Sequence, residues 1–397
     1  MKKEVINLFK VRMSKEASVE ASKILNSGYI GQGPVVDEFE EKLKERFKTD
    51  YVVTTNAATS AEHLAIHMLK TNNEVRKDVQ EYGYGLQSYW PGIMEGDEVL
   101  ATPLTCTATN FPILANGMKI KWVDVDEKTL NMDLDDLARK ITSKTKIIFI
   151  VHWGGYPVDL DRLKEIQEQA RMDFGFKPAV IEDCAHAFGS KFKNQPIGSH
   201  GNICTFSFQA IKHMTTVDGG CLVIPHQKLY NRAKLLRWYG IDRETNSKDF
   251  RCEADIPEWG FKFHMNDVNA SIGLANLKEV DTEVLEKHKS NAKYYDENLK
   301  DIPGLTLLER DSRMDSTFWI YSFLVDRKSD FMDYMKECKI MVSQVHERND
   351  IHSCVREFKT QLPTLDKIQP RLISIPVGWW VTHEDREYIV NCIKKGW

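Results

Sequence analysis

The sequence lacks the features that mark nucleic-acid-binding or membrane proteins. Its 54 lysines and arginines are outnumbered by 58 aspartates and glutamates, so no basic excess is available for a phosphate backbone. No run approaches the roughly 20 apolar residues of a membrane span, and the charged N-terminal residues do not resemble an export signal. We therefore expect no nucleic-acid partner and no membrane association.

Metal and dinucleotide motifs are also absent. The eight cysteines include no CxxC pair and no spacing typical of a disulfide frame, so we expect reduced thiols and a cytoplasmic protein. His63 and His67 are four residues apart but lack the glutamate of HExxH and a third ligand, which favours a packed or exposed pair and no metal. Neither GYIGQGP nor GYGLQS has the G-x-G-x-x-G spacing, which argues against a Rossmann dehydrogenase.

What is present is an alternation of apolar β-rich runs with helical patterns. An amphipathic helix is expected at 36–47, followed by strands that lack strict polar alternation and are therefore buried on both faces. From about residue 51 to 225 the pattern predicts successive βα units on a mostly parallel sheet, which is an α/β fold. The strand-forming runs are YVVTT, EVLATP, KIKWVDV, KIIFIVHW, AVIEDCA, ICTFSF and GCLVIP.

At 397 residues the chain is too long for one ordinary domain. The last third has a long charged helical segment near 284–300 and a β-run at 318–326, typical of a smaller α+β domain. We expect a large domain at 1–280 and a small C-terminal domain at 281–397. The polar, aromatic stretch at 71–92 fits neither pattern and is interpreted as an excursion, either a functional loop or a helical extension without catalytic consequence.

Candidate chemistry begins where two of the predicted strands end. Glu182 and Asp183 are the last residues of one apolar run, at the edge where a parallel sheet opens into a ligand crevice. For either acid alone, a role as a helix cap is the simpler interpretation. On the next strand Ser207 precedes Lys212 by five residues, and a glycine pair follows. An amine, an acid and a hydroxyl are the groups that pyridoxal 5′-phosphate requires for its Schiff base, its pyridine nitrogen and its phosphate.

A third element is the run VVTTNAATSAEHLAIH, in which a strand passes through small and hydroxyl residues into a helix starting near Thr59. The free N–H groups and positive dipole of such a helix end can hold a phosphate. Threonine and serine are also ordinary helix caps, so this element alone indicates little.

Taken together, these blocks resemble the DegT-type nucleotide-sugar aminotransferases, a branch of the pyridoxal-phosphate enzymes of fold type I, which have the aspartate-aminotransferase-like fold. The resemblance covers most of the chain and rests on the order of blocks. They are SGYIGQGPVVDEFEEKL, TNAATSAEHLAI, the run from GDEVLATPLTCTATN to KIKWVDVD, VHWGGYPVDLD, IEDCAHAFGS, FSFQAIKHMTTVDGG and EWGFKFHMNDVNASIGLANL.

The resemblance implies roles for individual residues. Lys212 would bind the cofactor covalently and move protons, Asp183 would pair with the pyridine nitrogen, and His186 would face the 3-oxygen of the ring. Two positions depart from the usual pattern: Cys106 stands where an aromatic ring commonly stacks, and Lys262 where asparagine is usual in a block that reaches the phosphate of the neighbouring subunit. The phosphate would be held by Ala58, Thr59, Ser60 and Ser207.

The function implied is transfer of an amino group from L-glutamate to a keto sugar, with a nucleotide-linked 4-keto-6-deoxyhexose as the expected acceptor, in a homodimer with shared active sites. The substrate would lie near Gly31, Gln32, Gly33, His346 and Asn349. Two alternatives stay open: a sugar dehydratase of the same family, disfavoured because that branch replaces the lysine with histidine, and a non-catalytic binder of pyridoxal phosphate. The sequence does not indicate the base of the nucleotide or the position that is aminated. It also leaves open a cyclitol or a smaller phosphorylated ketone as the acceptor.

Overall fold

The computed structural model describes residues 4–70, 91–243 and 255–397. The predicted excursion at 71–92 lies almost entirely outside the described residues. None of the described helices combines the length and the apolar character that a membrane crossing needs. Each cysteine within the described ranges is a free thiol.

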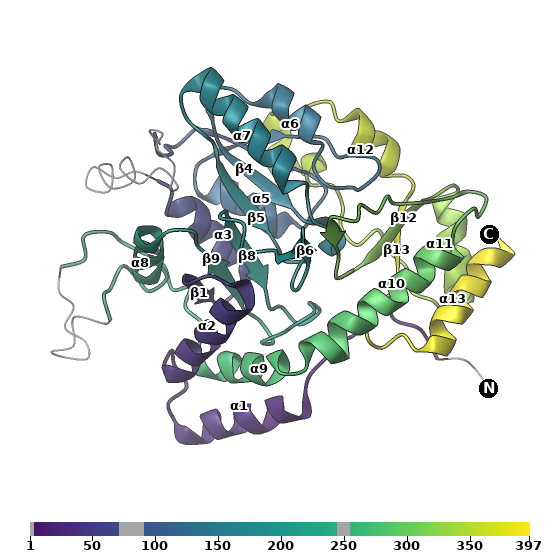
Figure 1. The fold of residues 1–397 in the computed structure, drawn as a ribbon, viewed down its shortest axis with the longest axis horizontal. Coiled ribbons are helices and arrows are strands. Elements are labelled where there is room, and N and C mark those ends of the chain that lie inside the picture. The colour runs from purple at the N-terminus through teal and green to yellow at the C-terminus, as the bar shows by residue number, and fades with distance from the viewer. Residues whose placement is uncertain (1–3, 71–90, 244–254) are drawn as a thin grey trace.

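A seven-stranded sheet forms the centre of the molecule (Figure 1). Its order is β1-β9-β8-β5-β4-β2-β3, and every strand runs in the same direction except β9, which is antiparallel to both of its neighbours. The prediction of a mostly parallel sheet is thus confirmed, with one reversal. The strands are β1 (Val52–Thr55), β2 (Glu98–Ala101), β3 (Lys119–Trp122), β4 (Thr145–Val151), β5 (Ala179–Asp183), β8 (Ile203–Ser207) and β9 (Gly220–Val223).

Both faces of this sheet are covered, because side chains alternate along each strand. On β4, Ile147 and Phe149 belong to one apolar core, while Ile148 and Ile150 belong to the other. The first core includes buried residues of α3 and α5, and the second includes those of α2, α6 and α7. The absence of polar alternation in the strand sequences follows from this double burial.

The helices begin and end where the sequence supplies caps. Helix α2 starts with Pro34 directly after Gly33 and buries the predicted stripe of apolar residues. Helix α7 is capped by Asp159 and ends at Gly175, which has a φ of 82°. The helices are α1 (Lys15–Ser27), α2 (Pro34–Phe47), α3 (Ala58–His67), α5 (Thr107–Ala115), α6 (Leu134–Lys140), α7 (Leu160–Phe174), α8 (Gln227–Leu236), α9 (Asp267–Leu277), α10 (Glu286–Asn298), α11 (Lys328–Glu337), α12 (Pro363–Ile368) and α13 (His383–Lys395).

The C-terminal third builds a second, antiparallel sheet in the order β10-β12-β13, formed by Leu305–Leu307, Tyr321–Val325 and Leu372–Ile375. A third apolar core lies here and includes buried residues of α10, α11 and α13, as well as Ile6 from the start of the chain. A short third sheet, β11-β6-β7 (Met314–Asp315, Lys191–Phe192 and Gln195–Pro196), links the last third of the chain to the loop after β5. The division at residue 280 falls between α9 and a π-helical turn, Asp281–Leu285, that leads into α10, and it stays a prediction.

Candidate active site

Lys212 lies in the loop that follows β8, at the carboxyl edge of the sheet. Its Nζ stands 3.6 Å from the centroid of the Trp319 ring, over the ring face. Burial lowers the pKa of this amine to about 8, although the nearby Asp183, Cys106 and Glu62 act in the opposite direction. Lys212 is therefore not a solvated surface lysine, and its amine gives up a proton closer to neutral pH than an ordinary lysine.

Asp183 is the last residue of β5, and its side chain is 4% exposed. One carboxylate oxygen accepts a hydrogen bond of 2.7 Å from the Thr109 hydroxyl on α5, and the other accepts one of 2.9 Å from the Ala185 backbone N–H. The second bond is the local turn expected of a strand-end acid. The first comes from a distant helix and holds the carboxylate at the edge of the sheet, on the side of Lys212.

Glu182, the neighbouring acid, points to the opposite face. It is fully buried, with Oε2 2.8 Å from His152 Nε2 and Oε1 accepting from Asn202. Burial alone would raise the pKa of Glu182, but the hydrogen bond and charge of His152 lower it overall. Cys184 lies close enough for a shared metal, yet His152 Nδ1 already accepts from the Val158 N–H and Nε2 faces Glu182, so the group forms a hydrogen-bonded structural pair.

His186 lies between two aromatic partners. Its ring stacks on Trp319 at 3.9 Å and lies parallel to the ring of His346 at 5.5 Å. Burial, together with the charge of Lys212, holds the pKa of His186 well below its usual value, so the ring is neutral. Because its Nδ1 accepts a hydrogen bond of 3.4 Å from the Gly154 N–H, the proton sits on Nε2, which is available as a donor.

The start of α3 is an uncapped helix end of the kind that can hold a phosphate. Its cap, Ala57, makes no side-chain hydrogen bond to the first turn. Gly220 of β9 packs against this turn so closely that a Cβ there would lie 2.5 Å from the Ala58 nitrogen. Ser207 is the residue paired with Gly220 across the two strands, so its buried hydroxyl lies beside the same helix end.

The remaining predicted cofactor residues surround this helix end. Thr59 is exposed on its first turn, and the Ser60 hydroxyl donates 2.7 Å to the Asn56 side chain. The Asn56 amide in turn donates to the backbone oxygen of Lys262, whose side chain is exposed. Cys106 is half-buried and caps α5 without a side-chain hydrogen bond. Their contacts with a cofactor, including any from Lys262 across a subunit boundary, stay predictions.

The predicted substrate residues separate into two places. His346 joins the Lys212 group, and its Nε2 is buried without a hydrogen-bond partner among the described residues. Asn349 lies beside it, but its amide group is already occupied: Nδ2 donates 2.8 Å to the Thr105 oxygen and Oδ1 accepts from Asn110. Asn349 therefore holds the loop that carries His346.

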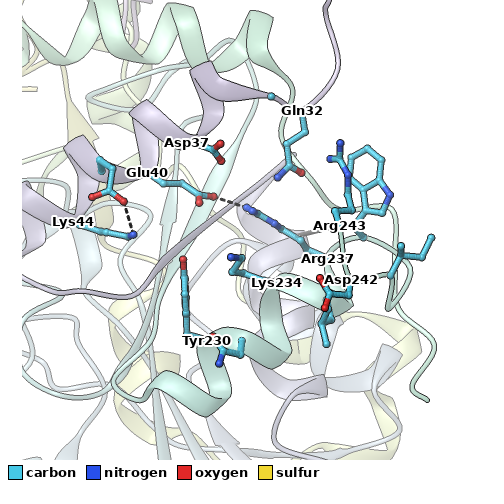
Figure 2. A pocket seen from close by; sticks show the side chains of 15 residues that line it. Gln32, Asp37, Glu40, Lys44, Tyr230, Lys234, Arg237, Asp242 and Arg243 are labelled. Atoms are coloured by element: carbon cyan, nitrogen blue, oxygen red, sulfur yellow. Dashed lines mark hydrogen bonds and ion pairs between the residues drawn. The ribbon is translucent and has the colours of Figure 1, made fainter. Parts of the chain in front are cut away.

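Gly31, Gln32 and Gly33 lie elsewhere, at the start of α2, where the Gly33 N–H donates 2.8 Å to Asp267. Figure 2 shows the pocket of about 610 Å³ into which Gln32 points, together with charged side chains from α2 and α8. Within it Arg237 forms a buried ion pair with Glu40, and Arg243 covers the Trp238 ring at 4.2 Å. None of the Lys212 group lines this pocket.

Three residues of the site were not predicted from the sequence: Trp319, Thr109 and Glu62. Trp319 lies in the strand-forming run at 318–326, where the sequence pattern predicts that an aromatic residue packs in the hydrophobic core. Glu62 is the one acid in α3, whose other buried residues are mostly apolar. A single acid among buried positions of a helix is a sequence signal that could have indicated it. Of the two arrangements that the sequence left open for His63 and His67, the structure has the packed one, since both rings contact Phe261 edge-on.

The arrangement fits pyridoxal phosphate. The buried amine of lowered pKa matches the aldehyde of that cofactor, and the buried carboxylate held by two donors matches its ring nitrogen. The neutral imidazole matches the ring oxygen, and the uncapped helix end, which has no room for a Cβ beside it, matches the phosphate.

Comparison with known proteins agrees with this geometry. The crystal structure of AtS13 from Actinomadura melliaura superposes with a TM-score of 0.92 at 47% identity over the full length of both chains. GDP-perosamine synthase of Escherichia coli O157:H7 is 30% identical over 94% of this chain and 93% of its own length. The UDP-4-amino-4-deoxy-L-arabinose–oxoglutarate aminotransferase of Shewanella sediminis is 28% identical, and the match covers 100% of this chain and 99% of that protein.

The family model described as the DegT/DnrJ/EryC1/StrS aminotransferase family matches residues 11–394. The predicted fold, the enzyme class and the cofactor, pyridoxal phosphate, are thereby confirmed. The chain belongs to the DegT/DnrJ/EryC1/StrS aminotransferase family.

Proposed function

We propose that this enzyme transfers the amino group of L-glutamate to the keto group of a nucleotide-linked sugar, with a 4-keto-6-deoxyhexose as the acceptor. The observation that carries the proposal is the Lys212 amine, held against Trp319 beside Asp183 and His186. The oxoglutarate and the nucleotide sugar in the name of the Shewanella sediminis relative support both the donor and the acceptor class.

Pyridoxal phosphate supplies the carbonyl that takes up the amino group and the conjugated ring that accepts electrons. Lys212 would hold the cofactor, and its amine is the group placed to carry the proton from the donor carbon. Its lowered pKa suits both tasks, since an amine must be neutral to act as nucleophile or base. Asp183, whose carboxylate is held by Thr109, would face the ring nitrogen, and the Nε2–H of His186 would serve the ring oxygen.

The reaction proceeds in two half-reactions, and the amino group released in the first is the one used in the second. L-Glutamate gives up its amino group and leaves as 2-oxoglutarate, and the keto sugar then receives that group and leaves as the amino sugar. His346 presents a buried nitrogen next to Lys212 that has no hydrogen-bond partner within the described ranges, and it is our candidate for a hydrogen bond to the sugar. At its low pKa of about 4, set by burial and by Lys212, this imidazole is neutral and adds no competing charge.

We assign the nucleotide to the pocket of Figure 2. It contains Lys234 and Arg243, which suit a diphosphate, and Gln32, whose buried Oε1 lacks a hydrogen-bond partner among the described residues. Because the residues of this pocket do not include Lys212, Asp183 or His346, we propose that a second copy of the chain completes the site. This is the homodimer with shared active sites that the sequence predicts.

The substrate proposal is tested by converting the enzyme to its pyridoxamine form with L-glutamate and adding a panel of keto-sugar nucleotides. We expect the absorbance of the pyridoxal form to return with a 4-keto-6-deoxyhexose nucleotide and not with the free sugar. Return of the absorbance only with cyclitol ketones or small phosphorylated ketones would overturn the acceptor assignment.

The shared site is tested by mixing Lys212→Ala, which lacks the reacting amine, with Lys262→Ala, under conditions that exchange subunits and at a pyridoxal phosphate concentration too low to fill the weakened Lys262→Ala site. A mixed dimer has one site that carries both substitutions and one that carries neither, so random mixing should restore about a quarter of the wild-type activity. No recovery in a mixture that demonstrably contains mixed dimers would contradict a contribution of Lys262 across the boundary.

A further inference from the structure

Glu62 is a buried acid on the second turn of α3 and forms no ion pair among the described residues. Only 1% of its surface is exposed, and the buried residues around it in α3 include Ala61, Leu64 and Ala65. Its Oε2 is enclosed, and no N–H or O–H group of the described residues donates to it. A glutamate in this state has to be explained, because an ionised carboxylate without donors is costly in the interior.

The groups facing Glu62 come from three other parts of the chain. They are Asp183 at the end of β5, Cys106 before α5 and Lys212 after β8, and Asp183 is the one within hydrogen-bonding reach. Asp183 already accepts from Thr109 and from the Ala185 N–H, and both bonds stabilise its ionised form. Two carboxylates are both acceptors, so their contact is favourable only with a proton between them.

We assign the proton between the two carboxyl groups to Glu62. Burial and then the negative charge of Asp183 raise the pKa of Glu62 well above its ordinary value, and Lys212 only partly opposes them. Asp183 has two donors of its own, the Thr109 hydroxyl and the Ala185 N–H. This is the behaviour of two carboxyl groups that share one site, where one of them stays neutral at pH 7.

We infer that Glu62 is a positioning residue of the active site: its neutral carboxyl donates a hydrogen bond to Asp183 and keeps the pair at one negative charge. The inference rests on the proposed pairing of Asp183 with the ring nitrogen of the cofactor. One negative charge matches the one positive charge of a protonated ring nitrogen. The hydrogen bond from Glu62 both orients the Asp183 carboxylate and disperses part of its charge, so that the ring nitrogen faces a less basic partner.

The protonation state is tested directly by infrared difference spectroscopy of the full-length protein, wild type against Glu62→Gln, with and without cofactor. At neutral pH we expect the wild type to show the carbonyl band of a neutral carboxylic acid, sensitive to deuterium exchange, that Glu62→Gln lacks. Glu98→Gln is the matched control, because Glu98 begins β2 at the opposite end of the sheet. A wild-type spectrum containing only ionised carboxylates would overturn the inference. The cofactor-free measurement does not depend on the proposed function.

The role is tested by comparing Glu62→Gln with Glu62→Leu in the half-reaction with L-glutamate. Glutamine keeps a donor and should react at close to the wild-type rate. Leucine removes a hydrogen bond to a charged group and should slow the half-reaction by roughly tenfold to a hundredfold. Equal losses in both variants would show that the charge of Glu62 is required, and an unaffected leucine variant would show that Glu62 plays no part; either result overturns the inference.

A spectroscopic signature separates this role from mere packing. With cofactor labelled with ¹⁵N at the ring nitrogen, Glu62→Leu should move deprotonation of that nitrogen to higher pH, because Asp183 then faces it with its full charge, and Glu62→Gln should leave it in place. An unshifted titration in a folded Glu62→Leu variant would contradict the inference. If instead the titration shifts as expected but no keto-sugar nucleotide is aminated, the positioning role stands and the substrate proposal fails.

Discussion

The Nζ atom of Lys212 lies over the face of Trp319, and the ring of His186 stacks on the same indole at 3.9 Å. One tryptophan from the last third of the chain therefore sets the position of two groups that come from the large sheet. The indole face attracts the protonated amine less strongly than a carboxylate in an ion pair would. Burial therefore still lowers the pKa of Lys212.

We expect capture of pyridoxal phosphate by the cofactor-free enzyme to accelerate as the pH rises and to level off above about 8. Burial lowers the pKa of Lys212 to about 8, and only the neutral amine attacks the aldehyde, so the neutral fraction rises through that pH. Stopped-flow absorbance at a series of pH values measures this. A rate that climbs until the ordinary lysine range, ~10.4, would show that the amine is not perturbed.

Lys212→Ala and Lys212→Arg should abolish transamination while the protein still binds pyridoxal phosphate through the start of α3 and Ser207. Neither side chain can carry the proton between donor and cofactor. Turnover with L-glutamate and cofactor retention on a desalting column are the two measurements. Lys278→Ala, an exposed lysine paired with Glu16, serves as the control. Near-normal turnover by the Lys212→Ala variant would exclude the proposed role.

Asp183→Asn should reduce the rate of the glutamate half-reaction by several orders of magnitude, because the ring nitrogen loses the charge that keeps it protonated. Thr109→Val removes only one of the hydrogen bonds to the carboxylate and should cost about tenfold. Single-turnover kinetics measure both, and thermal unfolding checks that the fold survives. A wild-type rate in Asp183→Asn would place the essential acid elsewhere.

Gly220→Ala should weaken cofactor binding more than it weakens the fold. Its Cβ would lie 2.5 Å from the Ala58 nitrogen, so the first turn of α3 must move away from Ser207. The dissociation constant of pyridoxal phosphate and the melting temperature of the cofactor-free protein should be measured together. A variant that loses stability but binds the cofactor as tightly as the wild type would contradict the cradle at this helix end.

The departures at Cys106 and Lys262 lead to a compensation test. Without an aromatic ring at 106, the cofactor lacks a stacking contact of roughly 0.5–1.5 kcal/mol, and a lysine in place of asparagine at 262 adds a charge-assisted contact to the phosphate. We expect Lys262→Asn to weaken binding of pyridoxal phosphate and Cys106→Phe to restore part of it, in titrations at fixed protein concentration. A Lys262→Asn variant that binds like the parent would refute the compensation.

The sequence by itself determined the large sheet and the two residues at its edge. Buried parallel strands are continuous apolar runs, so their number and their ends are visible locally, and Asp183 and Lys212 follow from the ends of two such runs. The same local signal predicted the buried stripe of α2. The reversal of β9 was not visible, because an apolar run carries no information about direction.

Only the tertiary structure decided which of these side chains meet. Glu182 and Asp183 are adjacent in the sequence, yet the pleat sends one to His152 and the other to Thr109. Trp319 reaches Lys212 across more than a hundred residues of chain. The neutral state of Glu62 likewise depends on what encloses it. The protonation states and contacts of these side chains are set by packing between segments that are distant in the sequence. The strand and helix periodicities of the sequence do not encode that packing.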